Sequence, residues 1–419
     1  MKLLPALSLA LTVVGAPPYA RTARAEGPPI DFAIPPEGAA AWARACSLRH
    51  PVCVHAAPRT RPSTTIAALA ATERAWEVVT GALALAPPDT EPDGAWHVYL
   101  VDGVEGGSTA LLAARDPIAH YDRASSFALV ERAMPTGCAL ELALARAVAR
   151  ASLWRMAPAT DEGSARAETQ MLARLAIPCY RGDVGDDEER LFEDEPERVL
   201  VDPASSAFDR GASLFFEWLD ADFATYPGAL VAGLWSLAPT LTRAGAWRWS
   251  GTPNGFDVLR VSLKNALGTD STLDDVLARF AVHRALASPP ARTAWRIPWP
   301  VKARRLASPT PEAPTGSSFV LIDLAGAPAG SKLRVEATWE DFARMRWNIV
   351  KLDAQGRALA DVPVTSLPLG TSASMTVEPL DGVDRVVVVG ANVGSTEHPF
   401  DPDQGWWEPH GWLLTVEGE

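Results

Sequence analysis

The sequence is poor in the residues from which enzymes build metal sites and nucleophiles. Its 419 residues include seven histidines and four cysteines, and no histidine lies between His120 and His283. The C-x-x-C spacing of structural zinc sites and the G-x-S-x-G turn of serine hydrolases are both absent. The middle of the chain therefore has no histidine-based metal motif and no recognisable serine nucleophile.

The chain also lacks a long apolar run. No stretch reaches the roughly 18 uninterrupted apolar residues of a membrane-spanning helix, so we expect no membrane span. At the start, Lys2 precedes a short apolar run, and Ala23-Arg24-Ala25 has the small-x-small pattern of a signal-peptidase site. We expect a signal peptide over residues 1–25 and a mature protein that is secreted or held in the periplasm or cell envelope.

Basic residues are in the minority. The whole chain has 38 Lys and Arg against 51 Asp and Glu, a formal net charge of −13. Residues 1–25 hold three basic residues and no acidic one, so the mature chain would carry a charge near −16. Such an acidic excess argues against nucleic acid and anionic membranes as the main partners.

Four cysteines in an exported chain favour disulfides over free thiols, because the number is even and the compartment is oxidising. Four cysteines allow three pairings. Of these, we expect the pairs Cys46–Cys53 and Cys138–Cys179.

The pattern of apolar residues predicts an α+β protein. Residues 26–300 are typical of a mainly helical domain with a small sheet, and residues 301–315 form a Pro-rich stretch that we interpret as a linker. Residues 316–419 contain short alternating runs separated by Gly, Pro and Asp, which predict a C-terminal antiparallel β-sandwich.

Within the first domain, strands are expected over residues 95–103 and 123–132, the second at the edge of the sheet. A short helix is expected near residues 39–46, and a turn at 104–109. The acidic run at 183–198 lacks the ligand order of a calcium loop, so we expect a solvated surface loop there.

The order helix, strand, edge strand, helix and a further helix opening on "DEG" resembles the gluzincin metallopeptidases. In that superfamily the edge strand aligns peptide substrate, the next helix carries H-E-x-x-H, and the following helix supplies a third zinc ligand. The resemblance implies that Glu162 holds the position of the third ligand, and that eighteen residues separate it from the second histidine position. The two histidine positions then fall at Ala139 and Ala143 and the catalytic glutamate position at Leu140, so the zinc-binding residues are missing.

A narrower resemblance covers nearly the whole mature chain. The segments "CALELALARAVARA", "RGASLFFEWLDADF" and "DPDQGWWEPHGWLLTV" are similar to a family of secreted myxobacterial proteins that are usually named metalloproteases. The resemblance implies a gluzincin-like first domain. The missing ligands favour a protein without a cofactor, and zinc is expected only if that interpretation is wrong.

Two other groups of residues are candidate sites. Near the C-terminus, "HPFDPDQGWWEPHGW" is a possible ligand-binding loop that could bind calcium and a sugar face, or a peptide. The alternative is a loop between strands whose tryptophans fill the end of the sandwich. A metal site built from His55, His97 and His120 is also possible, although isolated histidines are more often surface or hydrogen-bonded core residues. The loop residues that we single out are Asp401, Asp403, Trp406, Trp407 and His410.

These observations predict a secreted protein of metallopeptidase fold that is not a catalyst and that binds a peptide, a protein or a surface glycan. An active secreted metalloprotease with ligands from elsewhere in the chain is the alternative. A purely structural envelope protein is a third possibility. A protease requires three converging metal ligands, and a binding protein requires an open cleft.

Overall fold

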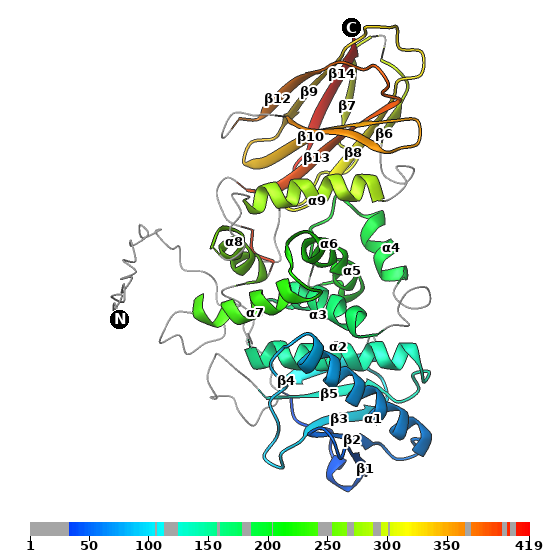
Figure 1. Cartoon of the computed structure of the whole chain (residues 1–419), viewed down its shortest axis with the longest axis vertical. Coiled ribbons are helices and arrows are strands. Elements are labelled where there is room, and N and C mark those ends of the chain that lie inside the picture. Colours follow the sequence, from blue (N-terminus) through cyan, green and yellow to red (C-terminus); the bar gives the residue numbers. More distant parts are fainter. Residues whose placement is uncertain are drawn as a thin grey trace, which may run out of the picture.

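Three parts follow one another along the long axis of the molecule: a five-stranded sheet, a group of helices, and two further sheets (Figure 1). They are seen in a computed structural model, which is a mixed α and β protein. The residues that the structure describes are 33–104, 107–112, 125–156, 160–177, 186–202, 204–241, 254–265, 272–287, 295–300, 302–364, 370–395, 400–402 and 408–419.

The first sheet has the strand order β1-β2-β3-β5-β4. Its central strands β2, β3 and β5 run parallel, and β1 and β4 are antiparallel to their neighbours. The strands are β1 (Ala43–Cys46), β2 (Val52–Ala56), β3 (Trp96–Val101), β4 (Ser108–Leu112) and β5 (Ser126–Glu131).

Two expectations about this sheet are wrong. The segment predicted as the edge strand is β5, which lies between β3 and β4, and the edge is β4, part of which was expected as a turn. The predicted helix near residues 39–46 is only a single 3₁₀ turn, Ala39–Ala41, followed by β1. Strands of four or five residues, such as β1 and β4, have too few side chains to show alternation, and pairing with the neighbouring strand stabilises them.

The disulfide Cys46–Cys53 is confirmed and joins β1 to β2. Cys138 is also disulfide-bonded. Cys179 lies outside the described residues, so the pair Cys138–Cys179 stays a prediction. A disulfide indicates a non-cytoplasmic environment.

One face of the sheet is covered by helices. The side chains of Trp96, Val98 and Leu100 belong to the same core as those of α1 (Pro62–Trp76) and α2 (Cys138–Met156). Alternation along β3 turns His97 and Tyr99 to the other face, where Tyr99 packs with Ala39 and Phe127. A π-helical turn, Glu77–Ala82, extends α1.

The helix α3 (Glu162–Ala176) packs on α2 and begins with an N-cap. The Asp161 carboxylate accepts a hydrogen bond from the Ser164 amide at 2.7 Å, which satisfies one of the free donors of the first turn. The "DEG" of the sequence is therefore the start of a capped helix. Further helices complete this part of the molecule: α5 (Ser206–Gly211), α6 (Ser213–Phe223), α7 (Ala229–Leu241), α8 (Gly255–Asn265) and α9 (Leu273–Ala287).

The acidic run forms a helix, α4 (Asp186–Asp194), where a loop was expected. Its carboxylates are not simply solvated: Glu188 pairs with Arg210 at 2.5 Å, and Glu189 pairs with Arg174. Phe192 on the same helix is fully buried. Arginines from distant helices neutralise the charge that would otherwise keep this segment in solvent.

The C-terminal part has two sheets, ordered β11-β10-β13-β8-β6 and β12-β9-β14-β7. Apolar side chains from both sheets, including Ile349, Val388 and Leu414, form one core between them, as the predicted sandwich requires. The other face of the sheet β11-β10-β13-β8-β6 packs on α9 (Figure 1). The strands are β6 (Trp295–Ile297), β7 (Arg304–Ala307), β8 (Ser317–Asp323), β9 (Leu333–Trp339), β10 (Ala343–Leu352), β11 (Ala358–Val364), β12 (Ser372–Val377), β13 (Arg385–Ser395) and β14 (Trp412–Gly418).

The stretch 301–315 is not a free linker. It contains β7, which pairs with β14, and the buried Glu312, whose carboxylate accepts a hydrogen bond from the Trp412 indole at 2.5 Å. The prolines of this stretch suggested a linker, yet Pro is compatible with the end of an edge strand. The boundary between the two parts is therefore a packed junction. In the part of the chain that the structure describes, the helices are all too short or too polar to cross a membrane.

Candidate functional site

A pocket of about 590 Å³ lies beside the edge strand β4. One wall is formed by residues 108–110 of β4, and the opposite wall by the helices α2 and α3. The loop after β3 and the start of α5 close the ends, through Gly103 and Ser206 among others. The volume lies within the range of small-molecule and peptide pockets.

Four arginines line this pocket, although the protein as a whole is acidic. Arg146 and Arg150 are four residues apart on α2 and therefore lie on the same helix face. Arg166 comes from α3 and Arg210 from α5. The carboxylates in the pocket lining are Asp102 and Glu162, and Asp102 is paired with Arg132 outside it.

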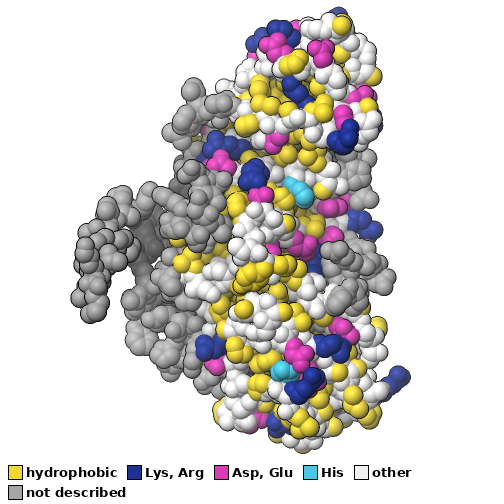
Figure 2. All heavy atoms as spheres, viewed as in Figure 1, with side chains coloured by type: hydrophobic (Ala, Val, Ile, Leu, Met, Phe, Trp, Pro, Cys, Tyr) yellow, Lys and Arg dark blue, Asp and Glu magenta, His cyan; other side chains and the backbone are white. Residues whose placement is uncertain are grey.

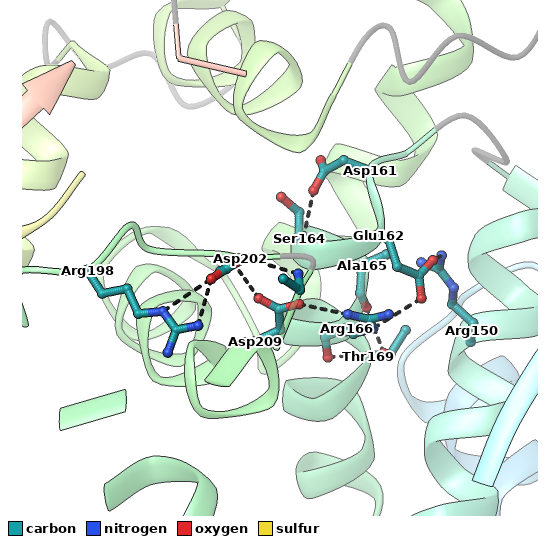
Figure 3. A network of polar contacts seen from close by, with 11 residues as sticks. Arg150, Asp161, Glu162, Ser164, Ala165, Arg166, Thr169, Arg198, Asp202 and Asp209 are labelled. Atoms are coloured by element: carbon teal, nitrogen blue, oxygen red, sulfur yellow. Dashed lines mark hydrogen bonds and ion pairs between the residues drawn. The ribbon is translucent and has the colours of Figure 1, made fainter. Parts of the chain in front are cut away.

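Glu162 lies between two of the arginines (Figure 3). One carboxylate oxygen pairs with Arg150, and the other accepts from Nε of Arg166 at 3.2 Å. Arg166 continues the network with Nη1 at 3.1 Å from the carboxylate of Asp209. Burial raises the pKa of Asp209 to about 7, against the opposing effects of the Asp202 amide and the charge of Arg166.

Arg146 and Arg210 share a single acid, Glu188 of α4. The Nη1 atom of Arg146 is 3.9 Å from its carboxylate, and Nε of Arg210 is 2.5 Å from it. Burial lowers the pKa of Arg146 to about 10; Glu188 opposes this shift, and the charges of Arg210 and Arg174 add to it. The cations at this end of the pocket are therefore crowded and only partly neutralised.

Arg150 is the most buried of the four arginines, with 7% of its surface exposed. Its guanidinium carbon lies 4.7 Å from the ring centre of Trp154, which fixes the plane of the group. One nitrogen, Nη1, is buried and has no hydrogen-bond partner among the described residues. An unsatisfied donor of this kind destabilises a protein by about 1–3 kcal/mol.

The residues that the sequence register singled out are only partly at this site. Glu162 lines the pocket, whereas Ala139, Leu140 and Ala143 are not among the lining residues. Leu140 is part of the hydrophobic core, and the Ala143 carbonyl accepts a hydrogen bond from Ser108 at 3.2 Å. Arg150, one of the two arginines that pair with Glu162, lies two helical turns beyond Ala143, roughly 10 Å along the axis of α2.

A signal for the observed site is present in the sequence, in "RAVAR" at 146–150. Arg146, Ala147 and Arg150 have the same spacing as the His, Glu and His of H-E-x-x-H. The eighteen residues 151–168 then separate Arg150 from Thr169. All four of these residues line the pocket. This spacing lies seven residues after the register set by the Glu-Gly pair, which forms the capped start of α3.

This set of residues does not fit a zinc ion. A guanidinium is a cation with five N–H donors and no acceptor, and it stays protonated in proteins. The Thr169 hydroxyl donates a hydrogen bond to the Ala165 carbonyl at 2.7 Å, one turn earlier in α3. The pocket is therefore suited to an anion.

The described residues include no group of three or more His, Cys, Asp or Glu placed to hold a metal. His55 and His97 do meet, with Nε2 of His55 2.9 Å from Nδ1 of His97, and Asp93 lies 3.0 Å from the far nitrogen of His97. Burial lowers the pKa of His55 to about 4, and the charges of His97 and Arg44 contribute. His120, the third member of the predicted set, lies outside the described residues.

The C-terminal loop is described in part. Asp403, Trp406 and Trp407 lie outside the described residues, so the proposed calcium, glycan or peptide site stays a prediction. His410 forms a backbone bridge with Glu312, and its Nδ1 lies 3.4 Å from the carboxylate of Glu340.

No family model and no curated protein matches the chain. Among solved structures, the pre-peptidase C-terminal domain of a Bacillus anthracis collagenase is 12% identical, and the match covers 30% of this chain and 94% of that one with a TM-score of 0.19. PliG, a periplasmic inhibitor of g-type lysozyme from Aeromonas hydrophila, is 11% identical over 30% of this chain and 99% of its own, with a TM-score of 0.18. A CBM4 structure is 14% identical over 28% and 82%, with a TM-score of 0.15. TM-scores this low carry no argument about function.

Proposed function

We propose that this chain is a non-catalytic binding protein of metallopeptidase architecture, which holds an extended peptide segment in the pocket beside β4. The observation that carries the proposal is the position of the pocket. It is bounded by an edge strand of the described sheet on one side and by α2 and α3 on the other. An edge strand offers free backbone donors and acceptors, so an extended segment can add to it as a further strand.

The order of elements supports the metallopeptidase part of the proposal. An edge strand, a helix with the i, i+1, i+4 pattern and a second helix enclose one pocket, which is the arrangement that the gluzincin resemblance implies. In our proposal Arg146 and Arg150 occupy the positions of the two histidines. Ala147 occupies the position of the catalytic glutamate, and Thr169 that of the third ligand. This assignment replaces Ala139, Leu140, Ala143 and Glu162.

The chemistry of the lining residues supports the non-catalytic part. A hydrolase of this type needs a metal ion or a free base to activate water. Both carboxylate oxygens of Glu162 are held by arginines, and Asp102 is paired with Arg132. These carboxylates act as partners of cations in the pocket wall.

An edge strand also favours a peptide or a protein segment over a glycan, because its backbone hydrogen bonds match another backbone. The disulfide Cys46–Cys53 supports binding outside the cytoplasm. The partner would be an unfolded or flexible segment of another exported chain.

The test is a selection of peptides from a random library by the mature protein, followed by hydrogen exchange on the complex. We expect selected peptides to protect the amides of β4. The variant Ser206→Trp should block binding, because residue 206 lines the pocket and a large ring would fill it. The matched control is Ser236→Trp on an exposed position of α7.

Binding that protects only the C-terminal sheets, or that survives in Ser206→Trp, would move the site away from the pocket and overturn the proposal. Hydrolysis of the selected peptides that chelators abolish would support an active metalloprotease instead. Both outcomes are read from the same samples, by mass spectrometry of the peptide and of the protein.

A further inference from the structure

Resting on the proposed function, we infer that the pocket recognises a carboxylate group of the bound peptide, and that the arginines of α2 and α3 hold it. The ligand class is therefore an acidic peptide. The carboxylate could belong to an Asp or Glu side chain or to a free C-terminus. These two sources share the same chemistry.

The ion pairs of the pocket support a negatively charged ligand. Within the described part of the chain, the four guanidinium groups share three carboxylates. Glu162 serves Arg150 and Arg166, Asp209 serves Arg166, and Glu188 serves Arg146 and Arg210. Glu162 and Glu188 are each shared by two arginines, and a carboxylate from outside would add a further partner for these cations.

The hydrogen bonding of Arg150 supports the same ligand. Its side chain is nine-tenths buried, so the group is held in place before any ligand arrives. The free Nη1 donor is satisfied if a bound acceptor reaches it. A carboxylate matches the planar fork of a guanidinium with two parallel hydrogen bonds, which a neutral amide cannot reproduce with equal strength.

The surroundings make the pocket distinct from the rest of the surface. On the face drawn in Figure 2, acidic and basic side chains are interspersed and form no broad basic patch. The arginines of the pocket lie in a concave, partly buried setting, where charges are screened less by salt and solvent. Backbone pairing with β4 would set the register of the peptide, and the arginines would then select an acidic residue at one position.

The first experiment measures binding by calorimetry with three capped or uncapped five-residue peptides. One has a central Asp and blocked ends, the second has Asn in its place, and the third is neutral with a free C-terminus. We expect a carboxylate-bearing peptide to bind at least about tenfold more tightly than the Asn peptide, since a charge-assisted hydrogen bond is worth about 1.5–3 kcal/mol. A preference between the first and third peptides identifies the source of the carboxylate.

The second experiment uses variants of the intact protein. Arg150→Met should abolish the preference for Asp over Asn, and Arg150→Lys should keep part of it, because the charge remains but the fork is lost. The matched control, Arg190→Met, removes an exposed arginine of α4 and should leave the preference unchanged. Circular dichroism and thermal unfolding show whether each variant is folded.

The outcomes separate this inference from the proposed function. If the Asp peptide, the Asn peptide and the peptide with a free C-terminus all bind wild-type protein equally, the carboxylate inference is wrong and peptide binding stands. If no peptide binds, neither from the set nor from the library, both fail. If Arg150→Met does not fold, the Arg150→Lys variant and the salt dependence of binding to the wild-type protein test the inference instead. A peptide affinity that does not change with salt contradicts the inference.

Discussion

The interiors of the helical region and of the sandwich differ in kind. Between the two sheets of the sandwich, most side chains that meet are apolar, as at Val335, Ile349 and Leu414, and the buried Glu312 beside Trp412 is an exception. Between α2, α3 and their neighbours, fully or nearly buried side chains include Arg150, Glu168, Arg174 and Asp209. Even when charges are paired, their burial removes them from water at a cost in free energy, so the helical region gives up stability that the sandwich keeps. The difference indicates that the sandwich core serves stability, while the charged interior supports a site.

The largest effect is expected in the sandwich. Leu414→Ala should lower the free energy of unfolding by about 2–5 kcal/mol, because it leaves a cavity in a fully buried position. The loss should be the same at pH 5.5 and pH 8, measured by urea unfolding. The control is the next residue, Leu413, which is 40% exposed and whose change to Ala should have an effect below about 0.5 kcal/mol. A loss that depends on pH would contradict the comparison.

In the helical region, stability should depend on pH. Burial raises the pKa of Glu168 to about 8, despite the 2.7 Å hydrogen bond from the Trp235 indole. The folded state thus holds a proton that the unfolded state releases near pH 4.5, and the stability from this group is lost as the pH rises through about 8.

The variant Glu168→Gln tests this point. It keeps an acceptor for the Trp235 indole and removes the titrating group. Between pH 5 and pH 8 the wild type should lose roughly 2–4 kcal/mol more than the variant, in urea unfolding at several pH values. Parallel curves for the two proteins would show that Glu168 does not titrate in this range.

On the face of the β1–β5 sheet that carries His55 and Tyr99, stability should fall as the pH is lowered, which is opposite to the effect of Glu168. Folding lowers the pKa of His55 from 6.5 to about 4, so the unfolded state takes up a proton first as the pH falls. Stability from this group is full above pH 6.5 and is lost as the pH falls toward 4. The variant His55→Gln should lose less stability over this range, by roughly 1–3 kcal/mol. If both proteins lose stability equally, the carboxyl groups alone account for acid unfolding.

The smallest effect is expected at the surface of the sandwich. The exposed carboxylate of Glu340 lies 3.4 Å from Nδ1 of His410, whose side chain is largely buried. Glu340→Gln should change the free energy of unfolding by less than about 1 kcal/mol, because a carboxylate in solvent gains little from an ion pair. A larger change, seen only when calcium or an oligosaccharide is added, would support the predicted ligand-binding loop.

Local pattern was sufficient for much of the fold. The strands β8, β9 and β13 lie where alternating runs predicted them, and α2 and α3 follow the helical spacing of the sequence. The pattern was insufficient for β4, β7 and α4. The strand β4 is too short to show alternation, whereas β7 pairs with the distant β14 and the acids of α4 pair with arginines of α3 and α5.

The candidate site shows the same division. The sequence contained Glu162 and the spacing of Arg146 and Arg150, and it excluded histidine ligands over the whole central region. It did not indicate that these arginines face α3, since a surface arginine and a buried one look alike in sequence. The sequence also did not indicate that the Glu-Gly pair follows a helix N-cap, because a capped helix start and a ligand turn use similar residues.

By itself, the sequence determined the elements that local chemistry controls: the helical spacing of α2 and α3, the alternation of the sandwich strands, and the absence of a histidine-based zinc motif. Only the tertiary structure decided which strand is the edge, which charges are buried, and that arginines from three helices share one pocket. The physical reason is that side-chain periodicity acts over a few residues. Strand order and charge pairing arise from contacts between segments that are far apart in the chain.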